Sequence, residues 1–474
     1  MTTREVARNQ GASPARRAGA VDLAVIGAGW AGLAAAVHAT RAGARVALFE
    51  RAAHAGGRAR EIRLELDAGP VRIDSGQHAL LGAYRECLEL ARITGGGRTP
   101  FERVPMRLAD TAGLLLEVRA RHAPWHLLGA LLRARGLTSG ERLAALGMMA
   151  ALRLRGWHVE ADETVAALLA RLHQPPALVR RLWQPLCVGV MNTAPALACA
   201  AAFAAVLRDT LGGPRAATDF LVPAGTLHEA LTQPAVDWLQ THGAEVRLQA
   251  GVRDLRRTTG QWEIDAGPGT NTSTVRAPHV VIATTAADAA RLLVSHLAPD
   301  DPRLQRFARL RYEPIASILL AWRHPVAPAL PRWILLHDDG EQAWGQWLFA
   351  RGSQGGWRLA TVIISVASAL PTMSRGEMAD AVAHQVSRQL GVPLADVRHA
   401  VIEKRATLRC TPDRPRFHQA MFGDHLPGIW LAGDYVDDEY PATLETAVRS
   451  GRRAVAAALA GRRRDHSFQT TSSA

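Results

Sequence analysis

Residues 21–60 place short apolar runs and turn signals in the order of a strand, a helix and a second strand. The apolar run at 23–26 enters a glycine-rich turn. An Ala- and Leu-rich helical pattern follows and ends near Gly43, and a second apolar run at 46–49 ends at Glu50. Two buried strands joined by a helix are typical of a βαβ unit in a parallel sheet. We therefore predict that this stretch begins an α/β domain.

Three glycines in the turn have the spacing of a dinucleotide-binding motif. The first glycine of such a motif allows a tight turn, the second lets the backbone approach a pyrophosphate, and the third lets the helix lie close to the sheet. Free N–H groups at the start of the helix attract the phosphates. The predicted contact residues are Gly27, Ala28, Gly29, Trp30, Ala31 and Gly32. The alternative is a buried, glycine-rich helix start that binds no ligand.

Glu50 supplies the acid that this motif requires at the end of the second strand, 18 residues after Gly32. A carboxylate at this place accepts hydrogen bonds from the ribose hydroxyls of adenosine. It also disfavours a 2′-phosphate, so the sequence argues against NADP at this site.

Two motifs from opposite ends of the chain resemble the superfamily of FAD-dependent amine oxidases and phytoene desaturases. The first is Glu50-Arg51 followed by Gly56-Gly57-Arg58, and the second is the segment 426–454, which contains Gly433-Asp434. The resemblance implies an FAD cofactor whose ribityl chain contacts Gly433-Asp434 and whose pyrophosphate and ring are covered by the following helix. The further contacts that it implies are Arg51, Gly57, Arg58, Val252, Thr443 and Leu444. The family commonly has Glu-Gly-Ala where this chain has Glu445-Thr446-Ala447, and a threonine there has less backbone freedom.

The remaining hydrophobic pattern predicts two kinds of region between these motifs. Helices are expected within 119–157, within 161–211 with breaks at Pro185 and Pro195, at about 227–239, after the strand at 279, and at 378–390. Strands are expected within 61–75, at 245–248, within 262–275, at 315–322, 333–336, 344–349, 359–366 and 401–406. The fold class is therefore α/β, with a discontinuous Rossmann-like FAD-binding domain, an interleaved α+β substrate domain and a helical insert.

The expected domain boundaries follow from these elements. The FAD-binding domain would consist of residues 21–100, 220–300 and 411–460, the helical insert of 101–219 and the substrate domain of 301–410. The polar ends, 1–20 and 461–474, are expected to be a disordered arm and tail.

Composition indicates a globular protein with a strongly basic surface. The chain has 474 residues, 48% of them hydrophobic and 21% charged, and its net charge of +13 is almost entirely arginine because Lys404 is the only lysine. Solvated arginine faces and attraction to anionic membrane lipid both remain open. No basic motif with interleaved aromatic residues is present, so nucleic acid is not an expected partner.

The cysteines and the hydropathy exclude several classes of protein. The four cysteines, at 87, 187, 199 and 410, are scattered without CxxC spacing or a histidine cluster, so we expect no metal site. Scattered cysteines fit a reducing cytoplasm. The first twenty residues lack the apolar run of a secretory signal, and no window is apolar enough for a transmembrane helix.

Residues 119–157 carry a pattern that allows two interpretations. Leucines repeat at three and four positions between Trp125 and Trp157, and arginines flank the apolar patches. Such a segment suits a helix that lies on a membrane surface, and it suits equally a core helix with a basic outer face. We therefore expect a cytoplasmic location, and peripheral contact with the cytoplasmic face of the inner membrane is one alternative.

Finer motifs resemble the squalene-associated FAD-dependent desaturases, from about residue 22 to about 459. They are GAGWAGLAAA at Gly27, DSGQHALLGAY at Asp74, LWQPLCVGVMNT at Leu182 and PATLETAVRSG at Pro441. The Asp74 and Leu182 stretches are the more specific to this family. The resemblance implies reductive dehydroxylation of hydroxysqualene, in which hydride from N5 of reduced FAD reaches an allylic carbon and water is lost. It also implies a hydrophobic isoprenoid substrate and squalene-pathway enzymes as neighbours, with the oligomeric state open.

Such a reaction needs a proton donor near the hydroxyl. His78 is the candidate catalytic residue, and a histidine that only packs its loop is the alternative. Other candidates follow Gly433-Asp434, namely Tyr435, Asp437, Asp438, Glu439 and Tyr440. A carotenoid- or phytoene-type desaturase, an amine oxidase and an isoprenoid-binding protein that keeps FAD for structure remain rival functions.

Overall fold

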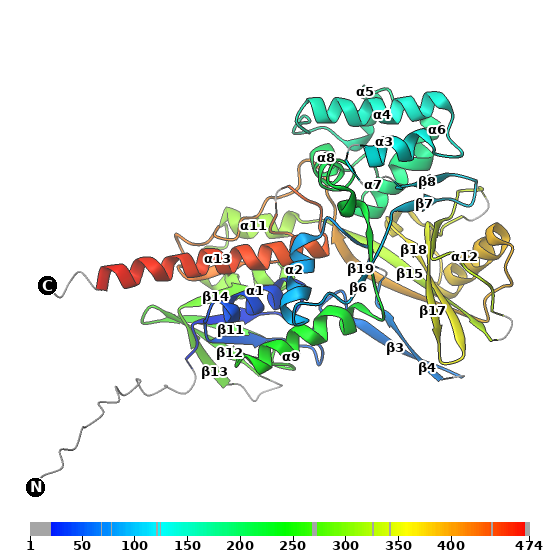
Figure 1. The fold of residues 1–474 in the computed structure, drawn as a ribbon. Coiled ribbons are helices and arrows are strands. Elements are labelled where there is room, and N and C mark those ends of the chain that lie inside the picture. The colour runs from blue at the N-terminus through cyan, green and yellow to red at the C-terminus, as the bar shows by residue number, and fades with distance from the viewer. Residues whose placement is uncertain are drawn as a thin grey trace, which may run out of the picture.

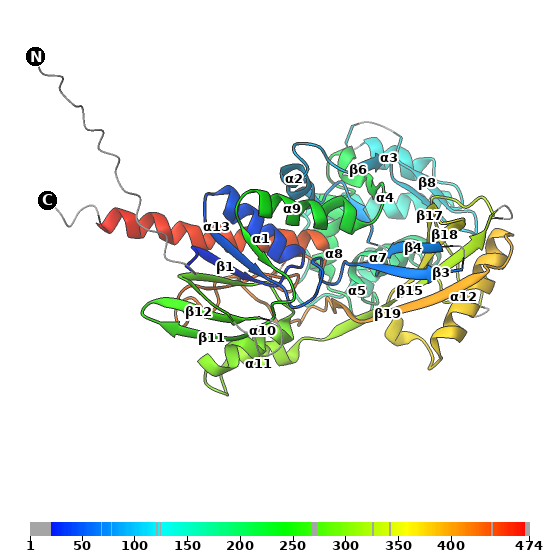
Figure 2. The ribbon, with the colours of Figure 1, turned by 90° about the horizontal axis from the view of Figure 1, so that it is seen from below.

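The computed structural model describes residues 20–469 except 68, 77, 120–121, 124, 268–272, 325–326, 341–342 and 438, with side chains to Ala460. Apart from Ala20, the predicted N-terminal arm lies outside the described residues. Figures 1 and 2 show a half built on a parallel sheet, a half built on an antiparallel sheet, and a helical insert beside the second half.

A five-stranded parallel sheet gathers strands from three distant parts of the chain. Its order is β10 (Glu245–Arg247), β2 (Val46–Phe49), β1 (Leu23–Ile26), β14 (His279–Ile282) and β20 (Ile429–Leu431). Every neighbouring pair is parallel. The predicted strands at 23–26, 46–49, 245–248 and 279 are therefore confirmed, with one residue less at the end of β10.

Helices cover one face of this sheet and an antiparallel sheet covers the other. The helices are α1 (Trp30–Arg41), α2 (Arg85–Thr94), α9 (Gln233–Thr241) and α13 (Leu444–Gln469). The antiparallel sheet comprises β11 (Val252–Thr258), β12 (Gln261–Ala266) and β13 (Ser273–Ala277). Successive residues of β1 belong to opposite cores, since Val25 packs with the helices and Ile26 packs with β11–β13. A strand buried on both faces must be continuously apolar, as this one is.

The second large sheet is antiparallel and has the order β16-β17-β18-β15-β19. Its strands are β16 (Trp333–Leu335), β17 (Trp347–Gln354), β18 (Trp357–Ile364), β15 (Tyr312–Arg323) and β19 (Val397–Leu408), and α12 (Arg375–Leu390) packs on one face. The predicted strand at 344–349 is wrong at its start, because the Gly345 N–H donates to Gln385 Oε1 instead of joining the ladder.

The helical insert has its own core. Its helices are α3 (Trp125–Leu132), α4 (Ser139–Leu154), α5 (Val165–Arg171), α6 (Pro176–Leu178), α7 (Gln184–Met191) and α8 (Ala200–Asp209). Leu182, Trp183 and Phe203 are buried in this core, which is the plain helix packing expected of a helical bundle. Short strands connect the insert to the rest, namely β6 (Phe101–Val104), β7 (Arg107–Ala109), β8 (Leu115–Glu117) and β9 (Phe220–Pro223).

Smaller elements complete the chain. They are the hairpin β3 (Glu61–Leu66) and β4 (Gly69–Asp74), β5 (Leu80–Leu81), α10 (Ala286–Leu293) and α11 (Pro302–Arg309). Short 3-10 turns lie at Arg215–Thr218, Val294–His296 and Ala367–Ala369.

The predicted helix break at Pro185 is wrong. Residues 176–191 form one continuous helical run that contains a π-helical turn at Val179–Trp183, and the Gln184 N–H donates to the Val179 carbonyl, five residues back. Proline lacks an N–H and crowds the carbonyl four residues before it, so a wider turn just ahead of Pro185 relieves both problems. The same π-turn occurs at His228–Thr232, just before Pro234. Pro195 does separate α7 from α8.

The predicted C-terminal boundary is also wrong. α13 continues to Gln469, so residues 461–469 of the expected disordered tail are helical. The run after Gly461 contains arginines and no proline, and such residues can extend a helix that is already formed. Residues 470–474 lie outside the described residues.

Candidate flavin site

A cleft of about 490 Å³ lies at the carboxyl ends of β1, β2, β14 and β20, where open α/β sheets bind their ligands. Of the predicted site residues, its lining contains Gly27, Gly29, Trp30, Ala31, Glu50, Arg51, Gly57, Arg58, His78, Val252, Gly433, Asp434, Thr443 and Leu444. Ala28 and Gly32 are outside this lining. Motifs predicted from distant parts of the sequence thus meet around one cavity.

The glycines form a cradle that no side chain could share. Gly27 has a φ of +100°, and a Cβ there would lie 2.7 Å from the Ala283 carbonyl oxygen. A Cβ on Gly32 would lie 1.8 Å from the Gly27 carbonyl oxygen. No side chain caps the N-terminus of α1, and Trp30 and Ala31 of its first turn line the cleft. The free N–H groups of this turn suit the pyrophosphate of a dinucleotide.

Glu50 is held in place by the backbone. Its two carboxylate oxygens accept hydrogen bonds from the N–H groups of Ala28 and Ala52, each at 2.8 Å. Ala28 is therefore a support for Glu50. The remaining lone pairs of Glu50 are free to accept from a ribose, as expected. Arg51 is largely exposed and lies 3.6 Å from Asp288, so it borders the same end of the cleft.

An ion pair joins the two FAD motifs at the other end of the cleft. Arg58 lies 2.6 Å from Asp434 and also donates to the Ala406 carbonyl at 2.8 Å. Burial lowers the pKa of Arg58, but Asp434 more than offsets this, so the net pKa is raised. Gly433 has a φ of +150°, and its N–H donates to Ser450 Oγ at 2.8 Å. This end is therefore rigid and charged.

The threonine that replaces the family's glycine is well accommodated. Thr446 lies in the first turn of α13, where its N–H donates to Thr443 Oγ1 at 3.2 Å and its hydroxyl donates to the Pro441 carbonyl at 2.8 Å. A helical residue needs no glycine. The neighbouring Glu445 accepts hydrogen bonds from the N–H groups of Glu86 and Cys87, both at 3.0 Å, and so caps α2.

His78 is the one proton-donor candidate among those described that lines this cleft. Its Nε2 is buried and has no hydrogen-bond partner within the described part of the chain. Burial, together with the positive charges of Arg58 and Arg351, lowers the pKa of His78 to about 4. The imidazole is therefore neutral at pH 7. A buried polar atom without a partner fits a position that a ligand completes.

The other described proton-donor candidates do not line this cleft, and three of them have structural partners elsewhere. Asp437 lies 3.2 Å from Arg453 and accepts from two backbone N–H groups, and Arg208 binds both the Tyr440 hydroxyl and Glu439, each at 2.7 Å. Tyr435 packs edge-on against Phe417, and its buried hydroxyl, like His78 Nε2, has no hydrogen-bond partner within the described part of the chain. Asp438 lies outside the described residues.

Sequence reasoning missed several residues that line or support the cleft. Glu403 and Thr407 of β19 line the cleft, and nothing in their local sequence marks them. Asn192 follows α7 with a φ of +45° and donates to Thr407 Oγ1 at 2.9 Å, while its Oδ1 accepts from the Val366 N–H at 2.7 Å. Asn192 thus fastens the helical insert to the cleft wall. Its place in the MNT of the Leu182 motif, at the end of a helical pattern, was an available signal.

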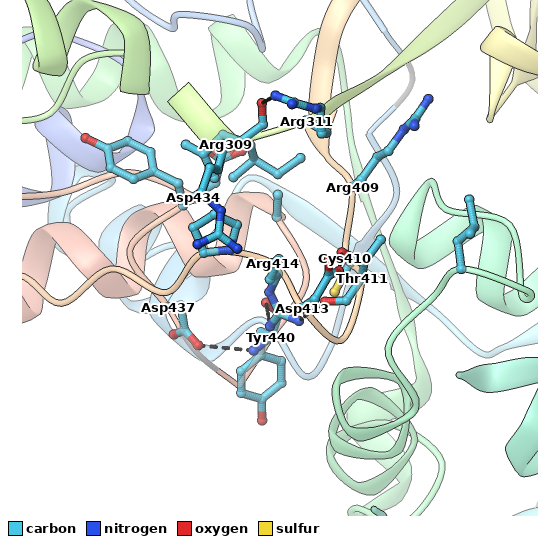
Figure 3. A pocket seen from close by; sticks show the side chains of 16 residues that line it. Arg309, Arg311, Arg409, Cys410, Thr411, Asp413, Arg414, Asp434, Asp437 and Tyr440 are labelled. Atoms are coloured by element: carbon cyan, nitrogen blue, oxygen red, sulfur yellow. Dashed lines mark hydrogen bonds between the residues drawn. The ribbon is translucent and has the colours of Figure 1, made fainter. Parts of the chain in front are cut away.

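A second cavity of about 410 Å³ adjoins the first and shares Asp434 and Ala442 with it. Figure 3 shows arginine side chains from two segments around it. They are Arg309, Arg311, Arg409 and Arg414. Of these, Arg409 is paired with Glu313 at 2.7 Å. The lining therefore combines four arginines and three aspartates with apolar side chains such as Leu310 and Leu408.

The described residues contain no cluster of His, Cys, Asp or Glu that could hold a metal ion. All four cysteines are free and buried. Burial raises the pKa of Cys187 and of Cys410 to about 12, so these thiols stay protonated at neutral pH.

The profile of the flavin-containing amine oxidoreductase family matches residues 30–459 of this chain. The chain belongs to this family. It is an oxidoreductase and its cofactor is FAD, for which the glycine cradle, Glu50 and the Arg58–Asp434 pair provide the fit. Each individual contact to FAD given above stays a prediction.

Several curated proteins are similar to this chain along almost its whole length. Hydroxysqualene dehydroxylase of Rhodopseudomonas palustris is 28% identical over 93% of this chain and 98% of its own length. The enzyme of the same name from Zymomonas mobilis is 28% identical over 92% and 98%. Carotenoid phi-ring synthase of Streptomyces griseus is 28% identical over 92% and 87%.

Solved structures confirm the fold. Cyclohexylamine oxidase from Brevibacterium oxydans superposes with a TM-score of 0.62 at 18% identity, covering 92% of this chain and 98% of that one. An oxidoreductase from Methanosarcina mazei gives a TM-score of 0.66 at 14% identity, covering 92% and 100%. The predicted α/β fold with a Rossmann-like FAD domain is therefore confirmed.

Proposed function

We propose that this flavoenzyme removes the hydroxyl group of hydroxysqualene reductively and releases squalene and water. The observation that carries the proposal is similarity to hydroxysqualene dehydroxylases over 92–93% of the chain, at 27–28% identity. The motifs at Asp74, Leu182 and Pro441, which carry the resemblance to this family, lie in the parts of the structure that surround or support the flavin cleft.

The proposed roles divide the cleft into two ends. Gly27, Gly29 and the first turn of α1 would hold the pyrophosphate of FAD, and Glu50 would hold the adenosine ribose. Asp434, fixed by Arg58, would hold the ribityl chain. When bound and reduced, FAD supplies the hydride that replaces the hydroxyl group.

His78 would bind the substrate hydroxyl as a neutral imidazole. Its lowered pKa means that it does not arrive protonated at pH 7, so its first task is to orient the hydroxyl through Nε2. Glu403 also lines the cleft, as do the carboxylates of Glu50, Asp288 and Asp434, and we propose Glu403 as the side chain to test for delivery of the proton to the departing water. The rates of squalene formation by His78→Gln and Glu403→Gln compare the two roles, which are orientation of the substrate hydroxyl by His78 and delivery of a proton by Glu403.

The product test is direct. Purified enzyme with FAD, reduced by dithionite under argon, is incubated with hydroxysqualene and the extract is analysed for squalene by mass spectrometry. Squalene from the reduced enzyme and none from the oxidised enzyme supports the proposal. Reduced enzyme that leaves hydroxysqualene unchanged contradicts it.

A desaturase acting on a carotenoid-like polyene is the second candidate, favoured by the similarity to carotenoid phi-ring synthase. It would run in the opposite redox direction, so the oxidised enzyme should be reduced by phytoene. An amine oxidase would instead be reduced by a primary amine.

We also propose a cytoplasmic location, which the four free, buried cysteines support.

A further inference from the structure

Exposed hydrophobic side chains gather on the helical insert. The described part of the chain has eight large hydrophobic residues that are strongly exposed, and four of them are on α3 and α4. They are Trp125 at 64%, Leu132 at 50%, Leu143 at 65% and Leu154 at 89% exposure. Single exposed leucines need no explanation, but a concentration on two neighbouring helices marks an interaction surface.

On α4 the exposed apolar positions form one stripe. Leu143, Gly147, Ala150 and Leu154 are all exposed and follow one another at intervals of four, three and four residues. This spacing places them on a single face about 16 Å long. The opposite face, which includes Met148 and Leu152, is buried in the core of the insert. The stripe is therefore surplus to the packing of the insert itself.

The end of α3 lies beside the start of this stripe. Arg142 of α4 donates to the Leu132 carbonyl at 3.0 Å and to the Leu137 carbonyl at 3.2 Å. Trp125 and Leu132 are seven residues apart, so they project from the same side of α3. In Figure 1 both helices belong to the insert at the top of the molecule, apart from the parallel sheet.

An arginine-lined cavity of about 300 Å³ adjoins α3. Its lining is Leu115, Glu117, Arg119, Gly129, Arg133 and Arg135. Glu117 accepts from both Arg107 and Arg119 and so is already shared between two cations. Arg133 and Arg135 add positive charge without a further carboxylate in the lining. This cavity suits an anionic phosphate group.

We propose that the exposed face of α3 and α4 docks on an anionic phospholipid bilayer, with the arginine cavity receiving a headgroup phosphate. Tryptophan and leucine beside arginines are the side chains of helices that lie in the interfacial layer of a membrane. Arginines at the rim match the negative headgroups in charge. No described helix is long and apolar enough to span a bilayer, so the contact is peripheral. The proposal is independent of which substrate the enzyme reduces.

The test is vesicle co-sedimentation of the FAD-loaded enzyme. Vesicles of phosphatidylcholine alone are compared with vesicles that contain phosphatidylglycerol, at low and high salt. We expect binding to the anionic vesicles that weakens as salt rises. Absence of binding at low salt would overturn the proposal. Equal binding to both vesicle types would overturn the role of the arginine cavity.

Matched variants assign the binding to this face. Leu143→Glu/Leu154→Glu should weaken binding about a hundredfold, because two leucines no longer enter the interface. The control Leu394→Glu changes an exposed leucine elsewhere and should bind as the parent does. Unchanged FAD content and melting temperature show that each variant is folded. Parent-like binding by the double variant would refute the assignment.

The cavity has its own variant. Arg133→Gln/Arg135→Gln should weaken binding to anionic vesicles about thirtyfold, at about fivefold for each arginine near the surface. The control Arg257→Gln/Arg375→Gln removes the same charge from exposed positions elsewhere and should have a much smaller effect. Equal losses of vesicle binding in the two arginine pairs would contradict a specific role for the arginine cavity.

Oligomeric state tests the other occupant of this face. A parent protein that is dimeric in solution and becomes monomeric with Leu143→Glu/Leu154→Glu would identify a second copy as the occupant and overturn the proposal.

Discussion

Helices α1 and α4 are both rich in alanine and both contain glycine, yet they occupy opposite environments. Nine of the twelve residues of α1 are buried, against four of the sixteen of α4. A Cβ on Gly32 of α1 would strike the Gly27 carbonyl oxygen, whereas a Cβ on Gly147 of α4 would meet nothing within 4 Å. Composition alone does not distinguish these helices.

The layers around each helix explain the difference. α1 lies between the parallel sheet and α13, and α13 comes so close that a Cβ on Gly451 would lie 2.1 Å from the Ala31 carbonyl oxygen. α4 has a core on one side only. Cofactor geometry therefore depends on α1, while the outer face of α4 is free to serve another purpose.

Gly32→Ala should have the largest effect of the variants that test this contrast. The added methyl group would have to displace the Gly27 carbonyl, which shapes the cofactor turn, so we expect FAD affinity to fall by more than about a hundredfold. The flavin absorbance of the purified protein measures retention.

Gly147→Ala is the matched control. Its methyl group enters open space in a helix, so FAD content should be unchanged and stability should rise by about 0.5–1 kcal/mol. Equal FAD retention by the two variants would contradict the contrast between the helices.

Asn192→Ala tests the connection between the two regions. It removes the hydrogen bonds to Thr407 and Val366 and places alanine at a φ of +45°, so the free energy of unfolding should fall by about 3 kcal/mol. Denaturant unfolding measures this. Asn192→Gly should recover the part that is due to backbone strain, and no recovery would leave the hydrogen bonds as the whole cause.

His78→Gln tests the cleft through pH. An unfolded histidine has a pKa of about 6.5, whereas native His78 has a pKa of about 4. Between these values only the unfolded chain binds the proton, so the stability of the parent falls as pH drops through this window. The variant should lose less stability on acidification. His158→Gln, at an exposed histidine, should keep the parent's slope in melting experiments, and an identical slope for His78→Gln would contradict the buried, neutral state.

Thr138→Ala should have a small effect on stability and none on the cofactor. Thr138 and Glu141 form a capping box at the start of α4, and its loss should lower the free energy of unfolding by about 1 kcal/mol. FAD content should not change, because α4 is remote from the cleft. Flavin absorbance and thermal melting check both statements together, and a loss of flavin would show that the regions are more tightly coupled.

Local physics explains which parts of the site could be predicted. The strand, turn and helix around Gly27 and Gly32 follow from steric requirements contained within a few residues, so the sequence pattern predicts them. The resemblance of the Gly433 segment then implied a meeting with Arg58, and the structure shows that meeting as an ion pair.

The parts that could not be predicted depend on partners far away in sequence. Glu403 lines the cleft only because β19 crosses behind it, and Glu445 caps α2 only because α13 lies against it. Both cases need tertiary structure that periodicity does not contain. The π-turn before Pro185 has a local cause instead, because a wider turn accommodates the proline within one helical run.

The most direct test of the account is the stoichiometry of one anaerobic turnover. Enzyme with fully reduced FAD is mixed with excess hydroxysqualene, the flavin absorbance is followed, and squalene is extracted at the end. The account predicts that the flavin becomes oxidised and that one squalene forms for each FAD. Flavin that stays reduced, or becomes oxidised without squalene, would contradict it.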